Sequence, residues 1–379
     1  MLNRTFAPAA GGAERYSIAL VEHLAARHEI HVFAQLIDHQ WPGVTYHRVS
    51  MPFRRPRWIN QIWFAIATWW VTRAGFDVVH SHENSWHGDV QTVHVLPVKH
   101  TLFSGLTGGA LAARMLKVWT SPRLLAYLWL ERFRYAVRKG RFVVVISETL
   151  RMFFAATYPA AQGMTCVITP GITLPQSPVT STLRLHARHQ LGLPPDKACL
   201  LFVGNDFRKK GLQTAIEAMV QMESNTVLAI VGHSGQLPYF RQQAATLGLK
   251  DRVFFLGAMA DVTPAYQSAD CLAHPTLEDT FAMVVLEAMS HGLPVIVSSV
   301  AYCGISGWLS DGVDALILDD PRDASVLACA VDKILADGVL RVSLAEAART
   351  FAAGFEWGAI AAAHEKIYKE VAAAHSTNY

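Results

Sequence analysis

Two carboxylates and a run of backbone amides stand together in the segment HPTLEDTFAMVVLEAMSHGLPVIVSS, residues 274–299. An apolar strand is predicted to end at His274-Pro275, and a helix to begin near Thr280 after a short loop. The first turn of a helix offers free N–H groups and a partial positive charge, which suit a diphosphate. The predicted donors are the amides of four consecutive residues: Thr280, Phe281, Ala282 and Met283.

The carboxylates themselves suit hydroxyl groups. Asp279, at the predicted helix mouth, could bind the hydroxyls of a sugar. Glu287 follows eight residues later, where it could accept hydrogen bonds from two vicinal hydroxyls, as on a ribose. The alternative is structural, with Asp279 as a helix N-cap and Glu287 as a solvated helix residue.

A second candidate site lies in LLFVGNDFRKKGLQTAIEA, residues 200–218. A buried strand is predicted to end at Gly204 and a helix to start near Gly211. The loop between them holds three consecutive cations: Arg208, Lys209 and Lys210. Such cations could clamp a diphosphate and stabilise the charge on a leaving group, although a solvated basic turn is the alternative.

The first half of the chain adds two weaker signals. Gly11-Gly12 precedes an amphipathic pattern, and a glycine pair there permits close approach of a ligand, although such pairs are also common in tight turns. Residues 77–96 hold four histidines: His80, His82, His87 and His94. A metal site is not favoured because they lack helical HExxH spacing. His94, at a predicted strand end, is interpreted as a polar contact to sugar or acceptor, whereas His80 and His82 could equally be packed structural residues.

Residues 99–141 form a basic stretch with interleaved aromatic residues. It has nine cations and one anion, Glu131. Residues 1–170 as a whole carry 18 Lys/Arg and 9 Asp/Glu, a balance of +9, against 15 and 21, a balance of −6, in the remainder. This pattern predicts contact between residues 99–141 and an anionic membrane surface. The alternatives are an ordinary helix pair with a cationic solvent face, or RNA, for which no binding motif is present.

Short β-branched runs alternate with helical patterns along all 379 residues, which predicts two doubly wound α/β domains with parallel sheets and a cleft between them. Candidate strands are 30–34, 77–81, 90–95, 141–146, 166–169, 200–204, 227–232, 253–257, 271–274, 294–298 and 315–318. Residues 170–181, rich in Pro, Thr and Ser, form the predicted linker. The predicted domains are 1–172, with its first strand shortened or missing, and 173–356, followed by a helix over 357–379 that crosses back onto the first domain.

The cysteines and the apolar runs indicate in which cellular compartment the chain is expected to fold. The five cysteines are widely spaced without a CxxC pair, which fits a reducing cytoplasm better than a disulfide framework or a zinc site. The N-terminus lacks the pattern of a signal peptide. The longest candidate membrane segment lies between Arg57 and Arg73 and has fifteen uncharged residues. Because a span needs about 20, this run is interpreted as a buried or interfacial helix.

Over nearly its whole length the chain resembles the GT-B-fold retaining glycosyltransferases of family 4, which include lipopolysaccharide-core heptose glucosyltransferases. The resemblance is carried by GGAER at 11–15, DVVHSH at 77–82, VVVISE at 143–148, PG at 170–171 and FEW at 355–357. The family's paired Glu residues, separated by seven positions, correspond to Asp279 and Glu287. Its usual Gly after the Phe is Ala282, and an early Arg of its phosphate loop is Asn205.

The resemblance implies a retaining, metal-independent transfer of a hexose from a nucleotide diphosphate sugar, expected to be a UDP-sugar. The implied acceptor is a cell-envelope glycan or a lipid-linked molecule such as lipopolysaccharide core. Lys210 matches the family's Lys before Gly, and His94 falls where many members place a functional His or Asp. The implied catalytic residues are therefore His94, Lys210 and Asp279, and the donor-binding residues are Gly12, Asn205, Arg208, Lys209, Lys210, Thr280, Phe281, Ala282, Met283 and Glu287.

No cofactor is implied, and the absence of a DxD motif agrees with a site that needs no metal. The expected location is cytoplasmic, peripheral on the inner face of the membrane, without nucleic acid as a partner. Two alternatives stay open. One is a nucleotide- or glycan-binding protein that has lost catalysis. The reason to consider it is that Asp279 replaces the Glu usual in the family. The other is a nucleotide-sugar epimerase or hydrolase on the same architecture.

Overall fold

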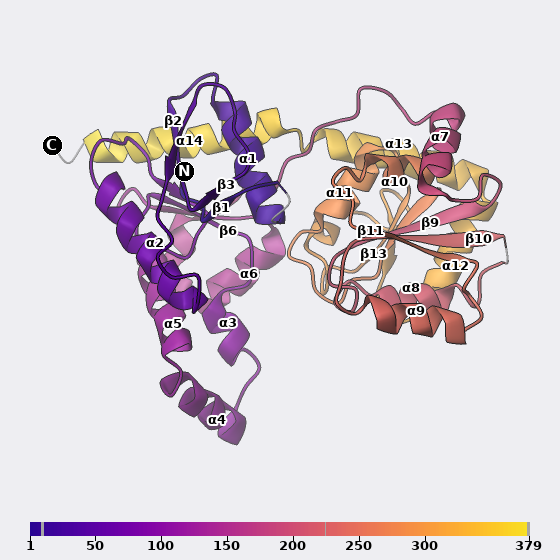
Figure 1. Ribbon diagram of the computed structural model, residues 1–379, viewed down its shortest axis with the longest axis horizontal. Coiled ribbons are helices and arrows are strands. Elements are labelled where there is room, and N and C mark those ends of the chain that lie inside the picture. Colours follow the sequence, from indigo (N-terminus) through magenta and orange to yellow (C-terminus); the bar gives the residue numbers. More distant parts are fainter. Residues whose placement is uncertain (9–10, 224, 377–379) are drawn as a thin grey trace. The chain divides into compact units, whose positions relative to one another are not determined.

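The structure, a computed structural model, describes residues 1–8, 11–223 and 225–376. The described chain forms two compact units. The first contains residues 1–171 and the C-terminal stretch from Trp357, and the second contains Ile172–Glu356. Figure 1 shows a sheet with surrounding helices in each unit.

The second unit is built on a six-stranded parallel sheet with the order β11-β10-β9-β12-β13-β14. Its strands are β9 (Ala198–Val203), β10 (Thr226–Val231), β11 (Val253–Gly257), β12 (Cys271–His274), β13 (Val295–Ser298) and β14 (Leu316–Leu318). The direction of winding reverses between β9 and β12, where Cys271 pairs with Leu200 and Leu272 with Leu201. In doubly wound sheets, ligands bind beyond the carboxyl ends of the strands at such a reversal.

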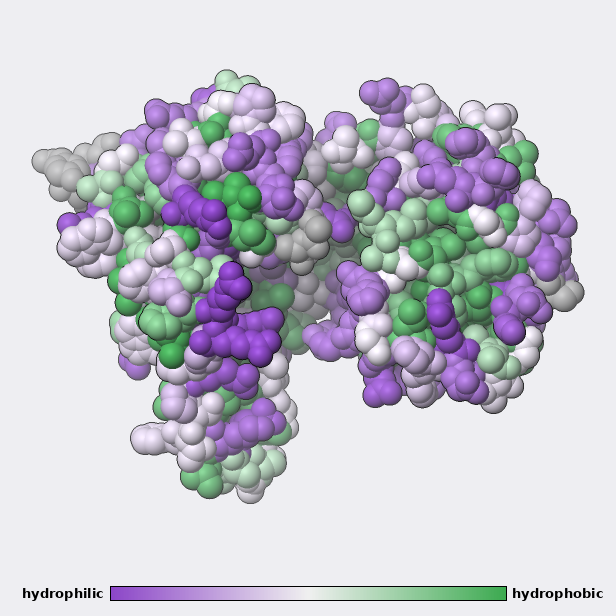
Figure 2. All heavy atoms as spheres, in the orientation of Figure 1, coloured by the Kyte–Doolittle hydropathy of each residue, from purple (hydrophilic) through white to green (hydrophobic). Residues whose placement is uncertain are grey.

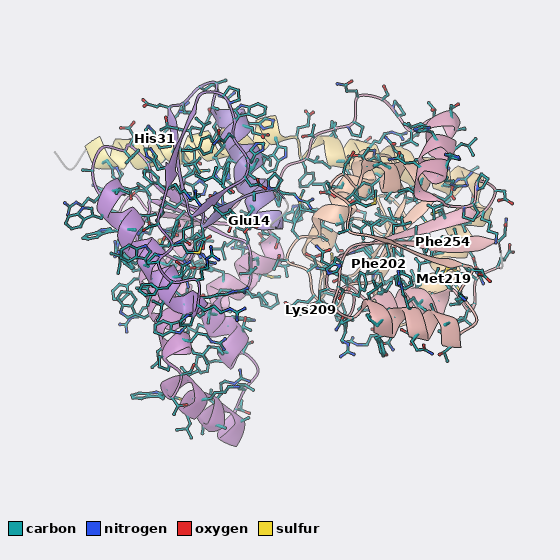
Figure 3. The ribbon with its side chains drawn as sticks, viewed as in Figure 1. Glu14, His31, Phe202, Lys209, Met219 and Phe254 are labelled. Atoms are coloured by element: carbon teal, nitrogen blue, oxygen red, sulfur yellow. The ribbon has the colours of Figure 1, made fainter. Side chains whose placement is uncertain are left out.

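Helices cover both faces of this sheet (Figure 1). They are α7 (Ser181–Leu191), α8 (Leu212–Ala218), α9 (Leu237–Thr246), α10 (Thr263–Ser268), α11 (Met283–Ser290), α12 (Ala324–Ala336) and α13 (Gly338–Ala353), with a 3₁₀ turn at Gly304–Trp308. Phe202 and Met219, labelled in Figure 3, belong to the apolar core of this unit. All six residues of β10 are buried, as expected for a central strand covered on both faces.

The first unit is also built on parallel strands. Its strands are β1 (Thr5–Phe6), β2 (Ile30–Ala34), β3 (Leu36–Ile37), β4 (Val44–Arg48), β5 (His80–Ser81), β6 (Val90–Val93), β7 (Phe142–Val145) and β8 (Thr165–Val167). Leu2 bridges Phe33 of β2 and Ser81 of β5, and thereby links the β2-β4 pair to the β5-β6-β7-β8 sheet. The first strand is therefore present but short: one bridge at Leu2, followed by the two residues of β1, which pair with β3.

The helices of the first unit are α1 (Gly12–Leu24), α2 (Arg57–Thr72), α3 (Val98–Phe103), α4 (Gly108–Trp119), α5 (Pro122–Arg134), α6 (Glu148–Thr157) and α14 (Trp357–Ser376), with a 3₁₀ turn at Pro159–Met164. Helix α14 packs against α1, where the Tyr16 hydroxyl lies 2.7 Å from His364 Nε2. Helix α2 buries Phe64 and Ala65 and exposes Trp70. In the part of the chain that is described, no helix combines the length and the apolar character needed to cross a bilayer. All five cysteines are free.

Candidate active site

The loops that follow β9 and β12 come into direct contact in the second unit. Gly211 has a φ of 76°, and a Cβ there would lie 1.8 Å from the carbonyl oxygen of Pro275. A side chain at position 211 would force the loops apart, so glycine is required on both counts. The Lys209 carbonyl accepts hydrogen bonds from the Leu277 amide at 2.7 Å and from the Thr276 hydroxyl at 3.1 Å.

This contact places a cation, a carboxylate and an imidazole together at the reversal of the sheet. Lys210 Nζ lies 2.6 Å from Asp279 Oδ2, and it also donates to the Glu278 carbonyl at 3.3 Å. His274, the last residue of β12, has its Nε2 3.2 Å from the same Asp279 oxygen. The Asp279 and Lys210 side chains are 15% and 23% exposed, so the pair is shielded without being sealed from solvent.

The electrostatics of this cluster keep Asp279 ionised. Burial alone raises the pKa of Asp279, but the hydrogen bond from His274 and the charge of Lys210 outweigh burial and hold the pKa well below its usual value. Burial lowers the pKa of His274, so the imidazole is neutral and donates its Nε2–H to the carboxylate. The ion pair is therefore Lys210–Asp279, and His274 is a neutral donor to it.

The N-terminus of the helix that follows β12 differs from the prediction in one respect. Helix α11 begins at Met283, three residues later than Thr280. The Asp279 Oδ1 atom accepts from the amides of Phe281 at 3.2 Å and Ala282 at 2.9 Å, which forms a turn ahead of the helix. Two of the four amides predicted to face a diphosphate are thus hydrogen-bonded to Asp279 in this structure.

Ala282 explains the late start of the helix. It is the N-cap of α11 and, among the described residues other than glycine, the only one with a positive φ, 73°. A left-handed residue cannot be part of a right-handed helix, so the turn closes before Met283. Glycine usually occupies this conformation because it lacks the Cβ that makes it costly.

The other two cations of the β9–α8 loop contact residues other than Asp279. Lys209 pairs with Glu278 Oε2 at 3.1 Å, and both side chains are more than half exposed. Lys209 projects from the loop at the edge of the unit (Figure 3). The Arg208 guanidinium lies 6.0 Å from the ring of Tyr239 in α9. Of the three predicted cations, only Lys210 contacts Asp279 in this structure.

Asn205 and Glu287 also have defined partners. Asn205 Oδ1 accepts from the His233 amide at 3.0 Å and so fixes the loop after β10 beside the loop after β9. Glu287 Oε2 accepts a 2.6 Å hydrogen bond from the Tyr266 hydroxyl of α10. A carboxylate oriented in this way, half-buried on α11, can still accept from further hydroxyl groups.

His274 and Tyr266 are contact residues that sequence reasoning missed. The available signal for His274 is its position at the carboxyl end of a predicted strand, five residues before Asp279. Tyr266 lies 21 residues before Glu287 and carries no local motif. Only the packing of α10 reveals it.

Two of the predicted residues, Gly12 and His94, lie in the first unit. Gly12 begins helix α1, and a Cβ there would meet nothing within 4 Å, so packing does not demand glycine. His94 directly follows β6, and its Nε2 lies 3.0 Å from His82 Nδ1. His80 is buried between Thr92 and Tyr368, each 2.7 Å away, which supports its structural interpretation. Within the described residues, no group of three or more His, Cys, Asp or Glu side chains could hold a metal ion.

Comparisons with known proteins agree with this architecture. Residues 10–175 match the model for Glycosyltransferase Family 4, and residues 184–351 match the model for Glycosyl transferases group 1. The chain is 32% identical over 169 residues to the lipopolysaccharide glucosyltransferase WaaG of Escherichia coli K12, a match covering 44% of each sequence. The chain spans about half the length of the curated relatives it matches.

Solved structures match nearly the whole chain. The WaaG crystal structure has a TM-score of 0.77 at 22% identity and covers 98% of both chains. Sucrose-phosphate synthase from Thermosynechococcus elongatus also has a TM-score of 0.77, at 25% identity and 98% coverage of both chains. Anabaena HepE, in complex with UDP and glucose, has a TM-score of 0.71 at 19% identity and covers 96% of this chain and 97% of its own. The two halves of the chain therefore match, in order, the models for Glycosyltransferase Family 4 and for Glycosyl transferases group 1, and the fold is GT-B.

Proposed function

We propose that this protein transfers a hexose from a UDP-sugar to a cell-envelope glycan or lipid-linked acceptor, such as lipopolysaccharide core, with retention of configuration. The observation that carries the proposal is the Lys210–Asp279 pair at the reversal of the second sheet, 2.6 Å apart and joined by neutral His274. The relative WaaG is named as a lipopolysaccharide glucosyltransferase, and HepE binds UDP and glucose on the same fold.

The proposed donor site lies in the second unit. Lys210 and the amides around the start of α11 would neutralise the diphosphate as it leaves. Glu287, oriented by Tyr266, would accept hydrogen bonds from the ribose hydroxyls. Asp279, kept ionised by its neighbours, would bind the hydroxyls of the sugar. The proposed site needs neither a cofactor nor a metal.

The proposed reaction exchanges one bond for another at the anomeric carbon. The bond from this carbon to the diphosphate oxygen breaks and leaves an oxocarbenium-like centre. The acceptor hydroxyl forms the new glycosidic bond on the same face, and its proton passes to the departing diphosphate. Lys210 would stabilise the charge that develops on the leaving group, where a preorganised cation contributes most.

The acceptor side is proposed to lie against an anionic membrane, which would place the protein on the inner face of the cytoplasmic membrane. We call the exposed face of α4 and α5 the α4–α5 surface. Its apolar members are Met115, Leu116, Trp119, Leu125, Trp129 and Phe133, and its exposed cations are Lys117, Arg123 and Arg132. Figure 2 shows hydrophobic and hydrophilic side chains side by side over these helices. Apolar side chains among cations suit a bilayer interface with anionic lipids.

Two of the nine cations counted in this stretch are buried within the unit. Arg134 is buried and donates to Gln91 Oε1 at 3.0 Å and to the Thr92 carbonyl at 2.7 Å. Arg141 is buried and donates to the carbonyls of Phe133, Arg134 and Trp86. These two guanidinium groups bind α5 to the sheet and are not available to a membrane. Fewer positive charges therefore face the membrane than the nine counted in the sequence.

Radiolabelled donors test the proposal. Purified protein would be incubated with UDP-[¹⁴C]glucose, and in parallel with other labelled UDP-hexoses, with and without lipid-linked glycan from bacterial membranes. We expect label to move into the glycolipid fraction only when acceptor is present, and NMR of the product to show the donor's anomeric configuration. Conversion of the sugar without acceptor would indicate an epimerase or hydrolase. UDP binding without any turnover would indicate a binding protein.

A chelator separates the metal-independent proposal from its alternative. We expect transfer to be unchanged in EDTA and unchanged by added Mg²⁺ or Mn²⁺. Loss of transfer in EDTA, restored by either ion, would contradict this part of the proposal.

A further inference from the structure

Four donors from within the second unit surround the Asp279 carboxylate. Its Oδ2 atom lies 2.6 Å from Lys210 Nζ and 3.2 Å from His274 Nε2. Its Oδ1 atom accepts from the backbone amides of Phe281 and Ala282. A carboxylate offers about four lone pairs. These contacts therefore use its accepting capacity, and a sugar hydroxyl can bind Asp279 only where one of the donors leaves.

Lys210 is the donor that can leave most easily. The two amides belong to the turn ahead of α11, and the His274 ring is fully buried at the end of β12. The Lys210 side chain is 23% exposed, and a lysine carries its charge on a flexible four-carbon stem. A diphosphate has more negative charge than one carboxylate, so it can attract the ammonium group away from Asp279.

The departure of Lys210 leaves a largely buried anion that other groups must stabilise. The Asp279 side chain is 15% exposed, and burial by itself raises the pKa of its carboxyl group. Cys303, whose backbone bridges that of Asp279, adds no positive charge, and burial raises the pKa of its thiol. The two amides and the His274 Nε2–H remain, and hydrogen bonds of this kind favour the ionised carboxylate.

The His274 ring is held as a neutral donor. Its Nδ1 atom is buried and has no hydrogen-bond partner among the described residues. A proton on Nδ1 would be an unpaired buried N–H, so the single ring proton lies on Nε2, toward Asp279. Burial also lowers the pKa of His274. The ring therefore donates to Asp279 without adding a charge that would compete with Lys210.

We propose that His274 is a positioning residue: it holds the Asp279 carboxylate ionised and in place while Lys210 moves to the diphosphate of the donor. The position that Lys210 vacates on Oδ2 then accepts a hydroxyl group of the donor sugar. The movement of Lys210 to a diphosphate rests on the proposed function, whereas the holding of Asp279 by His274 does not.

The holding role can be measured without any transfer reaction. Lys210→Ala removes the cation, and ¹³C NMR of the Asp279 carboxyl carbon, assigned by its loss in Asp279→Asn, then reports ionisation during a pH titration. In this background we expect His274→Leu to raise the pKa of Asp279 by about one to two pH units, because one hydrogen bond to a charged group is lost.

His274→Gln is the matched variant for this titration. Its amide nitrogen lies as many bonds from Cβ as Nε2 does, so it preserves a neutral donor to Asp279. We expect the pKa of Asp279 to stay within about half a pH unit of its value with His274. An unchanged pKa in His274→Leu would overturn the positioning role, whether or not the protein transfers a sugar.

The pH profile of transfer separates positioning from support of the fold. A raised pKa means that Asp279 loses its charge at higher pH, so we expect His274→Leu to move the acidic limb of kcat/KM upward by about one pH unit. His274→Gln should keep the unmodified profile, as should His186→Leu, the same substitution at an exposed position of α7. Circular dichroism checks that each variant folds. A loss of kcat/KM that is equal at every pH would overturn the positioning role.

A crystal structure of the unmodified protein with UDP tests the movement of Lys210. We expect Lys210 Nζ to lie within hydrogen-bond distance of a diphosphate oxygen, and His274 Nε2 to remain bonded to Asp279. Lys210 still paired with Asp279 beside bound UDP would overturn this movement.

Discussion

At the residue scale, the candidate site depends on one cation. Lys210 is the cation that contacts Asp279, whereas its neighbour Lys209 is exposed and pairs with Glu278. We expect Lys210→Ala to lower kcat by about 100- to 1,000-fold, the usual effect of removing one preorganised charge from a developing anion. The measurement is transfer of labelled sugar under donor saturation, with circular dichroism to show that the fold persists.

The matched control is Lys250→Ala, which removes an exposed lysine of the second unit far along the chain from both site loops. Its kcat should equal that of the unmodified protein. Near-normal turnover by Lys210→Ala would show that leaving-group charge is stabilised elsewhere.

Ala282 provides a second test at this scale. Its left-handed conformation costs a non-glycine residue roughly 1–2 kcal/mol, which glycine would avoid. Ala288, in the same helix, is right-handed and equally buried. Both Ala→Gly changes remove one buried methyl group and add the same conformational entropy to the unfolded chain. The difference between their free energies of unfolding therefore measures the backbone strain at position 282. We expect Ala282→Gly to be more stable than Ala288→Gly by about 1–2 kcal/mol in urea denaturation. Equal stabilities would mean that position 282 is not strained.

At the element scale, helix α14 is held by buried imidazole groups. His364 is fully buried, and its Nε2 lies 2.7 Å from the Tyr16 hydroxyl of α1. The neighbouring His80 bonds the Tyr368 hydroxyl of the same helix. Burial lowers the pKa of His364 to about 3, and it also lowers the pKa of His80.

This burial predicts a loss of stability in acid. Below about pH 6.5 the unfolded state binds a proton at His364 that the folded state does not, so stability is present above pH 6.5 and falls as the pH drops toward 3. Gln can preserve the bond to Tyr16 without titrating. Between pH 7.5 and 5.5 we expect His364→Gln to lose about 1.4 kcal/mol less stability than the unmodified protein, measured by urea denaturation.

The exposed His186→Gln is the control for this experiment, and its stability should follow the unmodified protein at every pH. A pH dependence of His364→Gln identical to that of the unmodified protein would show that His364 does not contribute to acid unfolding.

At the scale of the whole molecule, the proposed membrane contact predicts binding that depends on charge. Each lysine at an anionic surface contributes about 1 kcal/mol. We therefore expect Lys117→Ala, on the α4–α5 surface, to weaken binding to vesicles containing phosphatidylglycerol about fivefold, and added salt to weaken it further. Vesicle sedimentation measures both effects. Lys333→Ala, an exposed lysine of α12, should have no effect. Equal binding to vesicles of neutral lipid would contradict an electrostatic contact.

The amino-acid pattern alone is enough to predict the fold class and most of the strands. Runs such as 253–257 and 271–274 became strands with the predicted bounds, because short apolar runs between helical patterns form the strands of a parallel α/β sheet. The comparisons confirm the predicted GT-B fold. Strand β4 was missed because VTYHR is half-exposed at the sheet edge and has no apolar run.

The assembly of the candidate site depends on contacts that form only when the chain folds. The sequence placed Lys210 and Asp279 at strand ends, but 69 residues separate them, and the bond between them exists because Gly211 lets the loops touch at Pro275. The delayed start of α11 came from the side chain of Asp279 and the left-handed Ala282, which compete with helix formation locally. The partners His274, Tyr266 and His82 arise from packing between elements, and one-dimensional spacing carries no information about which side chains packing brings within 3.2 Å.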